Sequence, residues 1–343
     1  MAEENEQMQA LASETVPEQV PDKKTEHQQI GFLSISHKDK PLSEDVTNYL
    51  LEIQNAYPKL PLWVIMQDGD DDNELSDMGH ELWNKIYLSR EDLKENEPIL
   101  ILCVSPGGSA EYAYRIAKLI NNKCGEFKII VPHAAKSAAT LLALGAEEII
   151  IGKEGDLGPL DVQIRDLNEE REYSGLDEVQ SLDGLFDFAN DKILTTTIYW
   201  SRTLRRKRQS IFPAVIEYVT GMMKPLMEKI DTVHYMSLSR KLKVAEEYAY
   251  RLLLNKYGFY QAKIISKSLV ENYPYHGFII DKTESERIGL KNVTELSKRL
   301  QEVCDKLLIA TNDCSTCLIG KFFIKTFNYE KENNKSPIVP QPE

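Results

Sequence analysis

The sequence lacks an apolar run of about eighteen residues, the length that a membrane-spanning helix needs. Residues 1–29 also lack the basic start and apolar stretch of a secretory signal; they are acidic and rich in glutamine. These two absences predict a cytoplasmic protein without a membrane span.

Positive charge is scarce as well. Lys and Arg number 41 against 54 Asp and Glu, which gives a formal net charge of −13. Nonspecific attraction to nucleic acid or anionic lipid is therefore not expected. One basic run, at residues 202–208, stands out. We interpret it as a charged helix surface or a subunit contact, with an acidic partner or RNA as the alternative.

Metal-ligand patterns are incomplete. The five cysteines are odd in number and mostly scattered, which favours reduced thiols over disulfides. Cys314 and Cys317 form a C-x-x-C pair, but no second pair or nearby histidine completes a zinc site. The acidic residues 68–74 lack the glutamate that closes a calcium loop, since Gly79 occupies that position. We predict no metal and no cofactor.

The chain does have ample apolar residues, 42% of 343, to build a large core. Residues 1–28 are predicted to form a disordered acidic tail, and the proline-punctuated residues 329–343 a second disordered tail. Between them we expect one domain at 29–292, with a helical insertion at about 180–270. A C-terminal helix and the C-x-x-C segment follow at 293–328.

Short apolar runs alternate with helical patterns along the first half of the chain. Strands are predicted at 30–36, 62–66, 99–104, 128–131 and 148–152, and helices at 42–57, at 110–121 and directly after Ser137. This alternation predicts an α/β fold with a mainly parallel sheet and right-handed crossovers. Further helices are predicted at 180–210, 214–254, 263–270 and 294–308.

Ser137 stands between a predicted strand that ends at Pro132 and an apolar helix. A serine at a helix start lies near unpaired backbone N–H groups, which suits a nucleophile whose product carries an oxyanion. Serine is equally a favoured N-cap residue. The local pattern leaves both interpretations open.

A glycine pair, Gly107 and Gly108, follows the predicted strand at 99–104. Glycines leave their backbone N–H groups unshielded, so this pair is a candidate oxyanion hole, with the N–H of Ala138 as a further donor. A plain turn is the alternative, because Gly-Gly after proline is common at loop ends.

Several segments together carry a family resemblance: 105–108 (SPGG), 132–149 (PHAAKSAATLLALGAEEI), 157–163 (LGPLDVQ) and 273–281 (YPYHGFIID) followed by 288–290 (IGL). In this order they resemble the serine dehydrogenase proteinase family of the Clp protease and crotonase superfamily, which is related to signal peptide peptidase A. The resemblance covers about residues 95–292. It implies a Clp/crotonase-type fold, an oxyanion hole at the glycine pair and Ser137 as nucleophile.

The resemblance does not identify the base that activates Ser137. Where the Clp proteolytic subunit has its histidine, this chain has Asp161, which we assign to the pocket. His276 is the preferred base because neutral imidazole accepts protons near neutral pH. Lys192 and then Lys136 are the alternatives, since related peptidases use a lysine that burial keeps neutral. His133, four residues before the serine, is expected in the pocket and is the last candidate for the base.

The combined prediction is a cytoplasmic serine peptidase that cleaves extended peptides through a Ser137 acyl-enzyme. The superfamily implies a homo-oligomer, a ring or stacked trimers, for which the helical insertion offers apolar faces. Two alternatives stay open: a catalytically inactive scaffold that binds peptides or a partner, and a crotonase-like enzyme acting on acyl-CoA.

Overall fold

The computed structural model describes residues 27–34, 42–70, 73–161, 163–166, 171–312 and 317–327. Most of both predicted tails, together with Cys314 and the acidic residues 71 and 72, lies outside these ranges. The chain divides into two compact units, one formed by residues 1–30 and 324–343 and the other by residues 31–323. The second unit contains every predicted site residue.

A seven-stranded sheet forms the centre of the structure, in the order β1-β11-β2-β3-β4-β6-β10. Its strands are β1 (His27–Ser34), β2 (Leu62–Met66), β3 (Ile99–Val104), β4 (Phe127–Val131), β6 (Glu148–Ile151), β10 (Val293–Glu295) and β11 (Leu318–Phe327). The neighbours from β2 to β10 are parallel, and β11 pairs antiparallel with β2. The predicted α/β fold with a mainly parallel sheet is confirmed.

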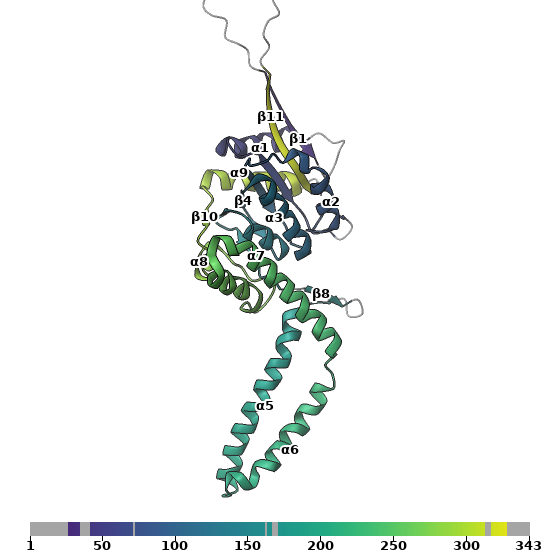
Figure 1. Cartoon of the computed structure of the whole chain (residues 1–343), viewed down its shortest axis with the longest axis vertical. Coiled ribbons are helices and arrows are strands. Elements are labelled where there is room, and N and C mark those ends of the chain that lie inside the picture. Colours follow the sequence, from purple (N-terminus) through teal and green to yellow (C-terminus); the bar gives the residue numbers. More distant parts are fainter. Residues whose placement is uncertain are drawn as a thin grey trace, which may run out of the picture. The chain divides into compact units, whose positions relative to one another are not determined.

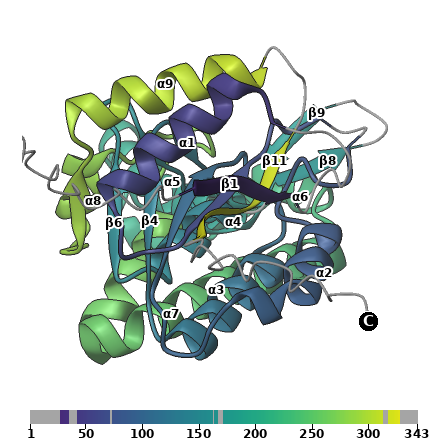
Figure 2. The ribbon, with the colours of Figure 1, turned by 90° about the horizontal axis from the view of Figure 1, so that it is seen from above.

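Helices cover both faces of the sheet (Figure 2). Helices α1 (Glu44–Ala56) and α9 (Lys298–Asn312) lie on one face, and α2 (His80–Leu88), α3 (Ala110–Cys124) and the long helix α7 (Thr232–Glu271) lie on the other. The short helix α4 (Ala138–Leu144) packs against α3 and α7. Because helices cover both faces, β2 is buried along its whole length and β3 along almost all of it, which explains their continuous apolar sequences.

Shorter elements complete the sheet region. Strand β5 (Ala134–Ala135) pairs parallel with β7 (Asp156–Leu157), and β8 (Gln163–Asp166) pairs antiparallel with β9 (Arg171–Ser174). A 3-10 turn, η1 (Arg90–Asp92), follows α2, and helix α8 (Lys282–Arg287) precedes β10.

The helical insertion consists of α5 (Gly175–Thr203), α6 (Arg208–Met227) and α7. Helices α5 and α6 lie side by side as a hairpin, in teal and green in Figure 1. The basic run at 202–208 is exposed and forms the turn of this hairpin. Helix α7 has a kink at Gly258, whose φ is +72°. The helix predicted separately at 263–270 is confirmed, because those residues lie in the helical part of α7 that follows the break at Gly258.

The C-terminal part also differs from the prediction. Residues 293–295 form β10 beside β6, so the last helix begins at Lys298 instead of residue 294. Strand β11, which was not predicted, joins the main sheet. The compact unit thus continues past the predicted boundary at residue 292.

Within the described ranges no helix combines the length and the apolar character needed to cross a membrane. The predicted compartment stays a prediction.

Candidate active site

Three loops meet where parallel strands end. One follows β3 and holds Gly107 and Gly108, one follows β4 and holds Ser137, and one follows β6 and holds Asp161. Parallel strands direct their carboxyl ends to one edge of a sheet, which is where such folds place sites. A cavity of about 810 Å³ opens at this edge, and Gly108, Ser137, Ala138, Asp161 and His276 line it.

Ser137 has an unusual backbone at the junction of β5 and α4. Its φ is +48° and its ψ is −115°, in a region that L-residues other than glycine rarely adopt. Its hydroxyl makes no capping hydrogen bond with the helix that follows. The N-cap interpretation is therefore wrong for the side chain. The strained turn instead leaves Ser137 lining the cavity.

The glycine turn is fixed against the neighbouring strand. The Ser105 hydroxyl donates to Gln67 Oε1 at 2.7 Å and accepts the N–H of Gly107 at 3.2 Å. Gly107 and Gly108 have φ values of +113° and +132°, which glycine adopts without strain. A Cβ on Gly107 would lie 2.7 Å from the Lys136 carbonyl oxygen and 2.8 Å from Ser137 Cβ. The turn thus packs directly against the serine, and a side chain has no room there.

Two of the three predicted oxyanion donors keep unpaired N–H groups. The N–H of Gly107 is directed to Ser105, as described above. Those of Gly108 and Ala138 have no acceptor among the described residues, and both residues line the cavity with Ser137. These two amides are the donors available to a developing oxyanion.

Strand β7 connects the serine to a distant loop. On one side, β7 pairs with β5, just before Ser137. On the other, Leu157 and Ile280 exchange backbone hydrogen bonds of 2.9 and 3.1 Å. The Thr140 hydroxyl accepts the N–H of Gly158 at 2.8 Å, which ties α4 to the same segment. Both the serine turn and the 273–280 loop are therefore positioned from one short strand.

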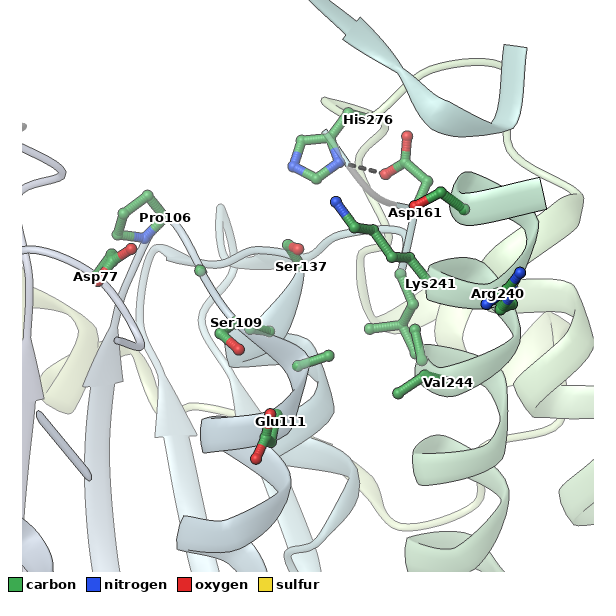
Figure 3. A pocket seen from close by; sticks show the side chains of 16 residues that line it. Asp77, Pro106, Ser109, Glu111, Ser137, Asp161, Arg240, Lys241, Val244 and His276 are labelled. Carbon is green, nitrogen blue, oxygen red and sulfur yellow. Dashed lines mark hydrogen bonds and ion pairs between the residues drawn. The ribbon is translucent and has the colours of Figure 1, made fainter. Parts of the chain in front are cut away.

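That loop carries His276 into the cavity. Nδ1 of His276 is hydrogen-bonded to the carboxylate of Asp161, which is buried, and Figure 3 shows this contact as a dashed line. Tyr273 anchors the loop by donating to Glu284 at 2.9 Å. Burial first, and then this hydrogen bond to Glu284, raise the pKa of Tyr273, so its phenol stays a donor.

Among the described residues no hydrogen bond joins His276 to Ser137, although both face the same cavity (Figure 3). In enzymes without substrate, catalytic hydrogen bonds are often long and tighten on binding. The structure thus brings together Ser137, Asp161 and His276, with a carboxylate oriented to hold the imidazole.

The other candidate bases lie elsewhere. Lys136 Nζ forms an ion pair with Asp156 Oδ2 at 2.7 Å and is not among the cavity-lining residues. Lys192 lies on α5, beside Asp191 at 3.2 Å and over the Phe188 ring, also away from the cavity. His133, expected in the pocket, is exposed and does not line it.

The sequence analysis missed two cationic residues. Arg240 and Lys241, on α7, line the cavity opposite the glycine turn. They stand between Leu238 and Leu242, two buried positions of a long helix, so the local pattern resembles any charged helix surface. Nothing in their spacing from Ser137 relates them to the site.

The thiols and acidic groups show no metal arrangement. Cys103, Cys124, Cys304 and Cys317 are free and buried, and burial raises the pKa of Cys103 and of Cys304 to about 12. Across the described ranges, no three His, Cys, Asp or Glu side chains are grouped so that they could hold a metal ion. The predicted C-x-x-C pair cannot be followed further, since Cys314 lies outside those ranges.

Part of the chain is similar to a known protein family. Residues 83–174 match the ClpP-like SDH-type serine proteinase family. Over these residues the predicted resemblance is confirmed. The matched segment contains the glycine turn, Ser137 and Asp161, whereas His276 and α7 lie beyond its end.

Two curated relatives come from Methanocaldococcus jannaschii, the uncharacterized proteins MJ1495 and MJ0137. This chain is 27% identical to the first over 228 residues, 66% of this chain and 61% of the relative. It is 26% identical to the second over 212 residues, 61% of this chain and 59% of the relative. The chain thus spans less than two thirds of the length of either relative.

Proposed function

We propose that this protein is a serine peptidase whose nucleophile is Ser137 and whose general base is His276. The observation that carries the proposal is the meeting of three features in one cavity. These are an uncapped serine in a strained turn, a histidine held by a buried aspartate, and two unpaired backbone N–H groups. The family match over residues 83–174 supports the same reaction class.

In the proposed mechanism, Asp161 accepts the Nδ1–H of His276, which leaves Nε2 free to take a proton. Nε2 removes the proton of the Ser137 hydroxyl as Oγ attacks the peptide carbonyl carbon. The carbonyl oxygen becomes an oxyanion and accepts the N–H groups of Gly108 and Ala138. The imidazolium then protonates the leaving amine, and the peptide C–N bond breaks to give an acyl-enzyme. Water, deprotonated by His276, hydrolyses this ester.

The substrate is proposed to be an extended peptide that pairs with a strand edge beside the glycine turn. We also propose a homo-oligomer in which the α5–α6 hairpin contributes a contact. The hairpin leaves large apolar side chains exposed, among them Phe186, Leu194 and Tyr199. Exposed apolar patches of this kind are common at protein interfaces.

An inactive scaffold with the same fold is the second candidate. The observation that favours it is the absence of a hydrogen bond between Ser137 and His276 among the described residues. A scaffold would bind peptides in the cavity without forming a covalent intermediate.

Labelling with a fluorophosphonate separates the two candidates, because an activated serine attacks the phosphorus of the reagent, displaces fluoride and keeps a phosphonyl group. We expect one adduct per chain on Ser137, located by peptide mass spectrometry and absent in Ser137→Ala. His276→Gln is expected to reduce the labelling rate at least about 100-fold. Ser109→Ala is the matched control, because this serine also lines the cavity and should label no differently from wild type.

Lys192→Gln tests the remaining alternative for the base and is expected to leave labelling intact, since Lys192 lies away from the cavity. If the correctly folded protein does not label at all, the peptidase proposal is rejected in favour of the inactive scaffold. Loss of labelling in Lys192→Gln but not in His276→Gln would assign the base to the lysine.

A further inference from the structure

The wall of the cavity formed by α7 is cationic. Arg240 and Lys241 line it, with Ser237 one turn before and Val244 one turn after. Figure 3 shows the Lys241 side chain extending into the cavity between α7 and Ser137, near His276 and Asp161. The opposite wall carries Asp77 and Glu111. The cavity thus has opposite charges on its two sides.

Within the described ranges Arg240 and Lys241 have no charged partner, whereas Asp161 and Glu111 do. Neither Arg240 nor Lys241 forms an ion pair or a side-chain hydrogen bond with any described residue. Asp161 is bonded to His276, and Glu111 pairs with Arg115 at 2.6 Å. Among the described residues no acid is paired with Arg240 or Lys241, so an anionic group that enters the cavity would meet two unpaired cations.

The surroundings of Lys241 suit a side chain with an apolar stem and a charged end. Val244 and Ala245, on the same helix, and Leu160 also line the cavity. An extended peptide with its carbonyl at Ser137 places neighbouring side chains on either side of its backbone. One of them would therefore lie along α7, with its stem on the apolar residues.

We propose that Lys241, assisted by Arg240, binds a carboxylate of the peptide substrate next to the bond that Ser137 cleaves. This inference rests on the proposed function in that the bound peptide is taken to be a substrate. Binding of the carboxylate does not depend on cleavage. The carboxylate belongs either to a Glu or Asp side chain or to the C-terminus of the peptide. In both cases the group bound is a carboxylate of the peptide.

A role for Lys241 as the base does not fit its position. A lysine serves as a base when burial disfavours its charged form, and Lys241 is exposed at the cavity wall. His276, with its buried aspartate, already supplies a group suited to that task. Lys241 is accordingly a residue that selects the substrate.

The test uses fluorogenic peptides in which each position flanking the cleaved bond carries Glu, Gln or Lys in turn, each made with a free or an amidated C-terminus. We expect kcat/KM to be about tenfold higher with a carboxylate than with its amide, either at one flanking side chain or at the C-terminus. A preference for Glu over Gln identifies a side-chain carboxylate, and a preference for the free over the amidated end identifies the C-terminus. Lys241→Met should bring this ratio close to one, and Lys241→Glu should favour Lys in place of Glu.

Lys243→Met is the matched control, because Lys243 is exposed on the same helix but does not line the cavity. It should keep the preference for the carboxylate. Lys241→Arg should also keep it, since arginine retains the charge but cannot act as a base. If Lys241→Arg abolishes cleavage of every peptide, Lys241 is the base and the proposal is overturned. An unchanged ratio in Lys241→Met overturns it as well.

A binding measurement separates failure of this inference from failure of the proposed peptidase. Fluorescence anisotropy of the same peptides on Ser137→Ala protein reports binding without chemistry. Tighter binding of acidic peptides that depends on Lys241 supports the subsite even if wild-type protein cleaves nothing. Equal or no binding of acidic and amide peptides overturns the subsite, even if wild-type protein cleaves them.

Discussion

The sheet and the α5–α6 hairpin use the same kinds of apolar residue in opposite ways. In β3 and β4 almost all of the apolar side chains are buried, and Phe127 at the start of β4 is fully enclosed. In the hairpin, Phe186 and Leu194 are 68% and 61% exposed. Apolar periodicity thus predicts where an element forms, but what covers its apolar face depends on the rest of the fold or on a partner.

The two regions also contribute differently to the site. The sheet supplies the groups that need fixed positions, namely the glycine turn, Ser137 and Asp161. The helical insertion separates Asp161 from His276 in the sequence, and its last helix supplies Lys241. The sheet edge therefore supplies the proposed nucleophile, oxyanion donors and aspartate, the loop after α7 supplies the proposed base, and α7 supplies the proposed selectivity.

The largest expected effect is at the glycine turn. In Gly107→Ala the new Cβ would lie 2.8 Å from Ser137 Cβ, and the φ of +113° would be strained for alanine. Displacement of the serine and of the amide beside it should lower the rate of fluorophosphonate labelling by about 100-fold or more. Gly125→Ala is the control, since its φ of +82° is similarly strained but its nearest neighbour, Asn96 Oδ1, is 4.0 Å away. Equal labelling in both variants would contradict the role given to the turn.

The next effect compares the two regions directly. Phe127→Ala removes a fully buried ring from the sheet core and should lower the free energy of unfolding by about 3–5 kcal/mol. Phe186→Ala removes an exposed ring from α5 and should change it by less than about 0.5 kcal/mol. Urea unfolding followed by circular dichroism measures both. A large effect of Phe186→Ala that grows with protein concentration would show that a second copy covers the hairpin.

Much of the sheet region could be predicted because its signals are local. The strand at 62–66 and the two turns with Gly107 and Ser137 each follow from a few adjacent residues. The Ser43 hydroxyl accepts the N–H of Val46 at 3.3 Å, as an N-cap serine should. Ser137 has a similar sequence context but makes no such bond, and its φ is +48° where that of Ser43 is −61°.

The rest depends on contacts between distant residues. His276 was a candidate from the sequence, but its pairing with Asp161, 115 positions earlier, requires the backbone bridge between Leu157 and Ile280. Lys241 reaches the cavity because α7 packs on α3 and α4. Strand β11 was missed since its neighbour in the sheet, β2, lies far away in the sequence. Periodicity carries no information about such pairings.

The smallest expected effect concerns a lysine by which α7 holds the helix after Ser137. Lys256 donates to the carbonyls of Leu144 at 2.8 Å and of Ala146, at the end of α4, and burial lowers its pKa from 10.5 to about 8. Below pH 8 the folded and unfolded chains both hold this proton, so the cost of burying the charge is fully present. Between pH 8 and 10.5 the folded chain releases the proton while the unfolded chain keeps it, so stability from this group rises with pH.

Relative to Lys256→Gln, which has no charge to lose, the free energy of unfolding of the wild type should rise with pH by about 3 kcal/mol at most. Urea midpoints of wild type and variant at pH 7.5 and pH 9.5 measure it. Lys267→Gln, on the exposed side of the same helix, is the control and should track wild type at both pH values. If wild type and Lys256→Gln shift in parallel, Lys256 is not desolvated. In that case α7 would pack on α4 less closely than the sheet packs on its covering helices. The looser packing of the helical insertion, compared with the sheet, would then extend to α4, the helix that begins after Ser137.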